Sequence, residues 1–102
     1  MAIMEFSMFP LDKGASLSEY VSRTLYIVDE SGLEYRLNPM GTVVEGEWDD
    51  LLILLTRCFR TLEKDSDRIS LSVKLDCRKG VSGALDKKIR SVEEKAGRSF
   101  RT

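Results

Sequence analysis

Three carboxylate side chains, Glu5, Glu45 and Asp76, lie in segments whose apolar and polar residues alternate. Carboxylates that meet on one surface can serve as general acid and base, or can bind Mg²⁺ or Ca²⁺ through their oxygens. Lys74 close to Ser72 could imitate a Ser-Lys pair, but such pairs need buried side chains in fixed geometry. On a sheet face, these side chains are more often solvated or paired with opposite charges. We therefore predict a polar surface, with no catalytic residue and no metal ligand.

Histidine is absent from the sequence, which removes the most common general base and the most common metal ligand. The two cysteines, Cys58 and Cys77, form no C-x-x-C motif, and the chain lacks the further ligands that a structural zinc site needs. Both cysteines fall on the apolar side of their segments. We therefore expect reduced thiols that pack in the core.

The segment RKGVSG (78–83) combines the cations Arg78 and Lys79 with two glycines. The backbone N–H groups of Gly80 and Gly83 could bind an anion beside these cations. The same composition is typical of an ordinary loop, so the segment alone does not define a site.

The chain has 102 residues, with 16 Lys and Arg against 17 Asp and Glu, and a net charge of −1. This length predicts a single domain over residues 1–102. The charge balance argues against a nucleic-acid-binding domain and against a polybasic membrane binder. No run of 18 apolar residues predicts a transmembrane helix, and the N-terminal residues do not resemble a signal peptide. We expect a cytoplasmic protein with neither nucleic acid nor membrane as a partner.

Hydrophobic periodicity predicts seven elements. Residues 2–9 alternate between apolar and polar side chains up to Pro10, as in a half-buried strand, and Ser16 with Glu19 forms a capping-box motif before a helix. Gly32 stands where that helix should end. The predicted strands are 2–9, 33–37, 42–46 and 68–77, and the predicted helices are 17–31, 47–64 and 85–96.

The order of these elements is β-α-β-β-α-β with an added C-terminal helix. It predicts an α+β, ferredoxin-like sandwich, in which right-handed crossovers place both long helices on one face of a four-stranded antiparallel sheet. Alternation assigns the apolar strand residues to the helix side: Met4, Phe6, Met8, Tyr35, Leu37, Val44, Leu71, Val73 and Leu75. The opposite, open face takes Glu5, Ser7, Glu34, Arg36, Asn38, Val43, Glu45, Ser70, Ser72, Lys74 and Asp76.

The open face is either an ordinary solvated surface or a polar binding floor that a second subunit encloses. If Leu37 pairs with Thr42 across the turn Asn-Pro-Met-Gly (38–41), Glu34 faces Glu45. Like charges directly opposite each other are unfavourable. A bound cation or Arg36 could relieve them.

Several sequence segments together resemble the small thiamine-binding protein family, once described as a domain of unknown function. The similarity covers about residues 3–95. The segments that match are EFSMFPLDKGASLSEYV (5–21), LEYRLNPMGTVVEGEWDDLL (33–52), SVKLDCR (72–78) and KIRSVEEK (88–95). Each is weak alone, but their order and spacing are specific.

The resemblance implies a ferredoxin-like fold, a cytosolic location and dimers that associate into homotetramers. It also implies a binding or carrier role, with thiamine as the candidate ligand and no cofactor. The sequence departs from this family at Cys77 and in KGVSGAL (79–85), which bears on the ligand site near the last strand.

Thiamine's chemistry selects candidate ligand residues within these motifs. A cationic thiazolium favours nearby carboxylates, and an aminopyrimidine favours hydroxyl, amide and backbone partners. A methionine or aromatic side chain can pack on the rings, for which Met40, Phe9 and Trp48 are available. The predicted ligand-binding residues are Glu5, Ser7, Asn38, Met40, Gly41, Thr42, Glu45, Ser72, Lys74 and Asp76.

The leading hypothesis is a non-enzymatic homo-oligomer, a dimer of dimers, that carries or senses thiamine or a related pyrimidine or thiazole. The alternative is a structural or regulatory homo-oligomer without a thiamine ligand, whose sheet face serves self-association. An enzyme that uses Lys74 and Asp76 is a third and weaker hypothesis. The presence of glycine at position 41 also has a simpler explanation than ligand binding, namely that the turn needs a glycine there.

Overall fold

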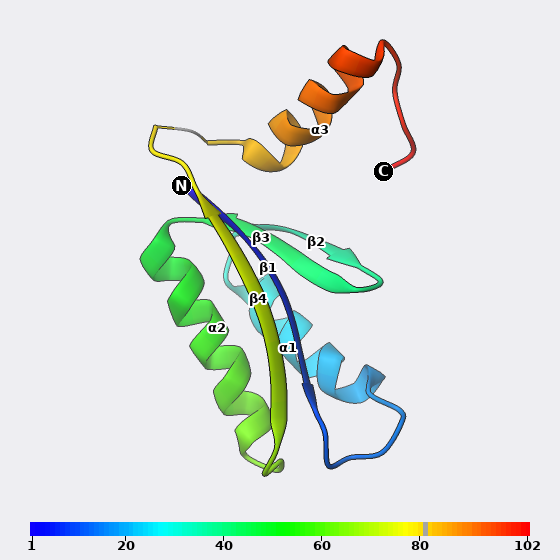
Figure 1. Ribbon diagram of the computed structural model, residues 1–102. Coiled ribbons are helices and arrows are strands. Elements are labelled where there is room, and N and C mark those ends of the chain that lie inside the picture. The colour runs from blue at the N-terminus through cyan, green and yellow to red at the C-terminus, as the bar shows by residue number, and fades with distance from the viewer. Residues whose placement is uncertain (81) are drawn as a thin grey trace.

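The computed structural model describes residues 1–80 and 82–102 and contains four strands and three helices (Figure 1). The predicted boundaries agree with the observed ones to within about two residues. The strands are β1 (Ala2–Pro10), β2 (Glu34–Asn38), β3 (Gly41–Gly46) and β4 (Ile69–Cys77); the helices are α1 (Ser18–Glu30), α2 (Trp48–Glu63) and α3 (Ala84–Ala96).

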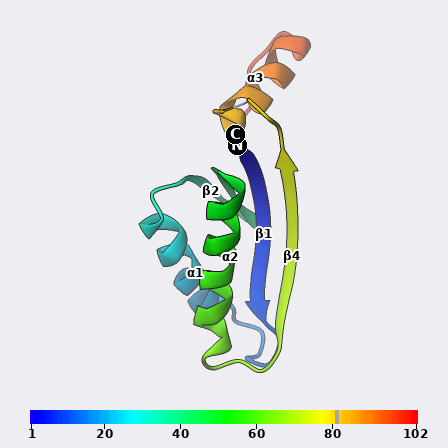
Figure 2. The same ribbon diagram turned by 90° about the vertical axis from the view of Figure 1, so that its left-hand side faces the viewer.

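The sheet has the strand order β2-β3-β1-β4, and every neighbouring pair is antiparallel. The helices α1 and α2 lie together on one side of it, whereas α3 lies beyond the strand ends near the N-terminus (Figure 2). This arrangement confirms the predicted ferredoxin-like fold.

The core lies between β1 and the two long helices. Every second residue of β1 is buried, because successive side chains of a strand point to opposite faces. From α2, the side chains of Leu51, Leu54, Cys58 and Leu62 close the core at helical spacing. Trp48 and Leu52, which the periodicity also placed on this stripe, are exposed, and Leu54 is buried in their place.

Three apolar strand residues predicted in the core are exposed. Leu71 and Val73 lie opposite Met8 and Phe6 in the register, so they do face the helix side. Their exposed fractions are nevertheless 42% and 43%, and that of Leu37 is 61%. These residues belong to the two edge strands, where the helices cover less of the sheet than at its centre.

The hairpin between β2 and β3 has the predicted register: Leu37 pairs with Thr42, and Glu34 with Glu45. Neither Pro39 nor Met40 has a positive φ, which agrees with a type I turn and excludes type II.

Gly41, at the end of this hairpin, is required for a reason other than turn conformation. A Cβ atom there would lie 3.2 Å from the backbone oxygen of Phe6 and 3.4 Å from Cγ of Glu5. Its φ is not in the left-handed region. The glycine therefore permits a close approach of β3 to β1, which corrects the simpler explanation from the turn.

The ends of α1 follow the sequence only in part. The predicted capping box of Ser16 and Glu19 is absent: Leu17 occupies the N-cap position and makes no side-chain capping bond. Gly32 follows the helix with a φ of +76°, as expected for the glycine that ends a helix.

Candidate functional site

A shallow hollow on the open face lies between β1 and β4. The register places Glu5 directly opposite Lys74, and Ser7 directly opposite Ser72. Met40 reaches this hollow from the β2–β3 turn and is 90% exposed. The hollow measures about 160 Å³, so it forms a floor with room above it. Five of the ten predicted ligand residues therefore meet here, in a region we call the β1–β4 floor.

A second hollow, of about 210 Å³, surrounds the hairpin turn. Asn38, Met40 and Gly41 line it together with Thr42. Thr42 is only 4% exposed and lies opposite Phe6, whose side chain belongs to the core. The hydroxyl of Thr42 therefore belongs to the helix side of the sheet. Met40 and Ser7 line both hollows and connect them.

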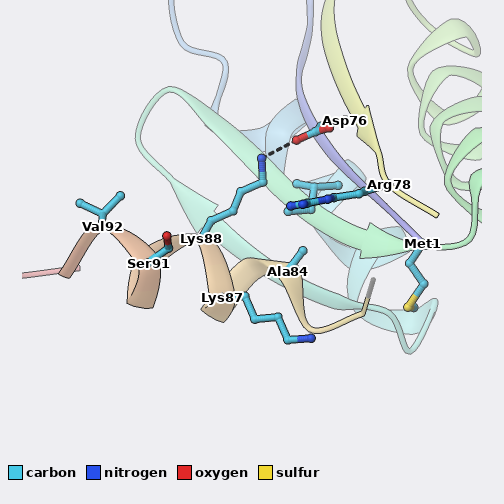
Figure 3. Close-up of a pocket in the computed structure, with 9 residues that line it drawn as sticks. Met1, Asp76, Arg78, Ala84, Lys87, Lys88, Ser91 and Val92 are labelled. Carbon is cyan, nitrogen blue, oxygen red and sulfur yellow. Dashed lines mark hydrogen bonds and ion pairs between the residues drawn. The ribbon is translucent and has the colours of Figure 1, made fainter. Parts of the chain in front are cut away.

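A third and larger hollow, of about 550 Å³, lies between α3 and the end of the open face (Figure 3). We call it the α3 hollow. Among the predicted ligand residues, it contains Asp76. Its lining is Met1, Ile3, Asp76, Arg78, Ala84, Lys87, Lys88, Ser91 and Val92.

Polar contacts hold α3 against the sheet. The backbone N–H of Ala84 donates a hydrogen bond of 2.6 Å to Oε2 of Glu45. Arg36 forms an ion pair with Asp86 in the first turn of α3. Glu45 is consequently only 5% exposed, and its carboxylate is used to position a helix. Because α3 covers it, Glu45 lies apart from the β1–β4 floor.

Asp76 is paired with a cation from α3. The Nζ of Lys88 donates a hydrogen bond to the Asp76 carboxylate (Figure 3). This bond and the charge of Lys88 lower the pKa of Asp76, and Arg78 and Lys74 add to the effect. Asp76 is therefore held as an anion whose charge Lys88 already balances.

The two cysteines are free and lie in different environments. Cys58 is buried, and burial raises the pKa of its thiol to about 11. Cys77 is exposed, which corrects the expectation that both thiols pack in the core. It is the last residue of β4, an edge strand that has no neighbouring strand on its outer side.

The aromatic candidates for ring packing are separated. Phe9 lies opposite Ser70 on the open-face side of β1 and is half-buried. Trp48 begins α2 on the other side of the sheet and is 45% exposed. Of the three side chains considered for ring packing, Met40 is the one that reaches the β1–β4 floor.

The sequence pattern did not single out Lys87, Lys88 or Ser91 of the α3 hollow. These residues belong to α3, which carries few apolar residues. A few individual polar contacts with the sheet, rather than a buried apolar face, determine its position. The available signals were Arg78, which stands beside the glycines of the following loop, and the segment KIRSVEEK (88–95), which resembles the family but does not by itself indicate a binding role. Within residues 1–80 and 82–102, no three His, Cys, Asp or Glu side chains gather in a way that could hold a metal ion.

A family model for thiamine-binding proteins matches residues 4–93. The chain belongs to the thiamine-binding protein family. Among its relatives is the UPF0045 protein MJ1052 of Methanocaldococcus jannaschii, 35% identical over 92 residues that cover 90% of this chain and 92% of that protein. The UPF0045 protein YqgV of Bacillus subtilis is 29% identical over 92% of this chain and 96% of its own length.

Solved structures of similar proteins share the fold. The crystal structure of MJ1052 has a TM-score of 0.84 at 34% identity, covering 91% of this chain and 96% of that one. A Thermotoga maritima protein, whose name carries a proposed thiamine biosynthesis/salvage role, has a TM-score of 0.78 at 22% identity over 89% and 97% of the two chains. That second similarity supports the fold alone. No helix in the described part of the chain is long and apolar enough to cross a membrane.

Proposed function

We propose that this member of the thiamine-binding protein family binds thiamine, or a related pyrimidine or thiazole, as a non-enzymatic carrier or sensor. The observation that carries the proposal is the β1–β4 floor. There the register gathers Glu5, Ser7, Ser72 and Lys74, and the neighbouring turn adds Met40.

Each group on the floor has a counterpart on thiamine. Glu5 is exposed and offers a negative charge to the cationic thiazolium. The hydroxyls of Ser7 and Ser72 can both donate and accept hydrogen bonds, as an aminopyrimidine requires. Lys74 adds a donor opposite Glu5, and Met40 offers a polarisable surface for a ring.

We further propose that the functional form is a homo-oligomer, a dimer of dimers, in which a second copy covers the floor. A hollow of about 160 Å³ leaves most of a drug-sized ligand exposed, whereas binding sites usually bury most of it. The edge of β4 also has unpaired backbone groups, and Leu71 and Val73, both more than 40% exposed, add apolar surface on the helix side of this edge, so that self-association there complements the cover over the floor rather than forming it. Burial of such an edge against a second copy removes apolar surface from water.

Isothermal titration with thiamine tests the ligand. We expect Glu5→Gln to weaken binding at least tenfold, because it removes the charge but keeps the shape. Glu34→Gln is the matched control, since Glu34 is exposed on the same face and lies outside the hollow. A folded protein that binds neither thiamine nor its pyrimidine and thiazole halves contradicts the proposal.

The exposed apolar side chains of β4 favour one alternative, a structural or regulatory homo-oligomer that uses the sheet for self-association. In that case, Ser72→Ala or Glu5→Ala changes the mass measured by light scattering. If these variants keep their mass and lose thiamine binding, the binding function is supported.

A further inference from the structure

We propose that the α3 hollow binds the phosphate group of a phosphate ester whose organic part extends over the β1–β4 floor. The inference deepens the proposed function, on which it rests for the identity of the organic part, because it makes the preferred ligand a phosphorylated form of the thiamine-like molecule. The phosphate subsite itself follows from the charges and contacts of the α3 hollow.

The first step is the charge of the lining. Three cationic side chains, Arg78, Lys87 and Lys88, line the hollow together with one carboxylate, Asp76. Lys88 and Asp76 pair with each other. Across the described residues, neither Arg78 nor Lys87 has a carboxylate within ion-pair distance. Two unbalanced cations therefore line one hollow, and together they favour an anion with two negative charges.

The second step is the geometry of the donors. The backbone N–H of Arg78 donates to the carbonyl of Met1 at 3.3 Å, which fixes Arg78 beside the end of β1. Lys87 lies in the first turn of α3, and Ser91 follows one turn later on the same helix face. Arg78 brings a guanidinium from the sheet and Ser91 a hydroxyl from the helix, and Lys87 also lines the hollow, although its ammonium is drawn pointing away from Arg78 (Figure 3). Phosphate oxygens accept from all three kinds of donor.

The third step is the apolar part of the lining. Ile3, Ala84 and Val92 also border the hollow, whose volume of about 550 Å³ far exceeds the space that one phosphate group fills. An organic molecule uses this surface, whereas an inorganic ion does not. The lining therefore favours an ester over free phosphate.

The fourth step is continuity with the floor. Ile3 lies opposite Asp76, and the next pair on the same face is Glu5 with Lys74. These two pairs are two residues apart along β1, or about 7 Å at the usual rise of a strand. One elongated ligand can therefore have its anionic end in the α3 hollow and its ring over the floor.

Isothermal titration with thiamine, thiamine monophosphate, thiamine diphosphate and inorganic phosphate tests the proposal. We expect the phosphate esters to bind at least tenfold more tightly than thiamine, and inorganic phosphate to bind most weakly. Arg78→Gln and Lys87→Gln should each remove most of the advantage of the esters while leaving the affinity for thiamine unchanged. Lys79→Gln is the matched control, because Lys79 follows Arg78, is exposed and does not line the hollow.

Equal affinities for thiamine and its phosphates overturn the inference, and so does an ester advantage that survives in Arg78→Gln and Lys87→Gln. A nucleoside monophosphate separates this failure from that of the proposed function. Suppose that the nucleoside monophosphate binds, that Arg78→Gln weakens this binding, and that no thiamine compound binds. The phosphate subsite is then supported, and the thiamine assignment is wrong. All substituted side chains are exposed, and circular dichroism verifies that each variant is folded.

Discussion

Oε2 of Glu45 accepts a hydrogen bond of 2.6 Å from the backbone N–H of Ala84, so that a carboxylate of β3 holds the first residue of α3. The first N–H groups of a helix have no partner within the helix, and the helix dipole is positive at this end. A buried anion at this position satisfies both. It also gives the Glu45 carboxylate a partner other than the bound cation or Arg36 that could have relieved its pairing with Glu34.

We expect Glu45→Ala to detach α3 from the sheet. Loss of a hydrogen bond to a buried charged group costs about 1–3 kcal/mol. Hydrogen exchange should therefore accelerate in residues 84–96 while the exchange of β1 stays slow. Glu34→Ala removes the exposed carboxylate of the same cross-strand pair and should leave α3 protected. Unchanged protection in Glu45→Ala would show that other contacts hold the helix.

Gly41→Ala should destabilise the fold by about 1–3 kcal/mol, as overpacking in well-packed regions does. The added Cβ meets the backbone oxygen of Phe6 at 3.2 Å, and the backbone of a central strand cannot easily move away. Urea unfolding measures the loss. Met40→Ala in the same turn is the control, because Met40 is 90% exposed, and it should change stability little. Equal stability of Gly41→Ala and the parent would contradict the close approach.

The cysteines should differ in reactivity. Iodoacetamide should label one thiol per native chain, that of Cys77, and two per chain in denaturant, as counted by mass spectrometry. Cys58 is protected both by burial and by a pKa raised to about 11, because the thiolate is the reactive form. Cys77→Ser should abolish labelling of the native protein, and Cys58→Ser should preserve it. Native labelling that persists in Cys77→Ser would contradict this assignment.

The raised pKa of Cys58 also predicts a loss of stability in alkali. The thiol of the unfolded chain begins to ionise near its ordinary pKa of 9.0, whereas the folded protein keeps the thiol protonated up to about pH 11. Between these values ionisation stabilises the unfolded state alone, so the free energy of unfolding falls. Stability should therefore fall from about pH 9 towards pH 11, and Cys58→Ala should show less of this fall despite its smaller core.

Acid should weaken a contact between two loops. Ser66 Oγ donates to Oδ1 of Asp12 at 2.5 Å, and the backbone N–H of Asp67 donates to Oδ2 at 2.8 Å. These bonds, that of Ser66 first, lower the pKa of Asp12. The stabilisation is therefore present above the ordinary carboxyl pKa of 3.8 and is lost as the pH falls through the lowered value.

Urea unfolding between pH 2 and pH 7 tests this contact. Asp12→Asn should be less stable at neutral pH and should lose less stability in acid than the parent does. Glu94→Gln, on the exposed part of α3, should keep the acid dependence of the parent. Parallel acid curves for the parent and Asp12→Asn would show that Asp12 contributes nothing.

The open face could be predicted from the sequence because the side chains of a strand alternate with a period of two. Once Leu37 was paired with Thr42, the pairing of Glu34 with Glu45 followed, and both are observed. Alternation also assigns Glu5 and Lys74 to the same open face, but their direct opposition depends on the β1–β4 register, which the sequence pattern does not define.

Coverage of the strands could not be predicted in this way. Alternation assigns Leu71 and Val73 to the helix side, but how far α2 extends over the edge depends on packing angles that have no local signature. The position of α3 was missed for a related reason, because it depends on long-range contacts such as that between Glu45 and Ala84.

The connection of α3 to β4 within one chain gives the α3 hollow a property that a subunit interface lacks. Its two walls are joined by the six residues 78–83, so their encounter is intramolecular and its equilibrium is independent of protein concentration. A cover over the β1–β4 floor supplied by a second copy would dissociate on dilution. In a dilute cell extract, the α3 hollow would therefore stay formed, whereas the β1–β4 floor would lose its cover.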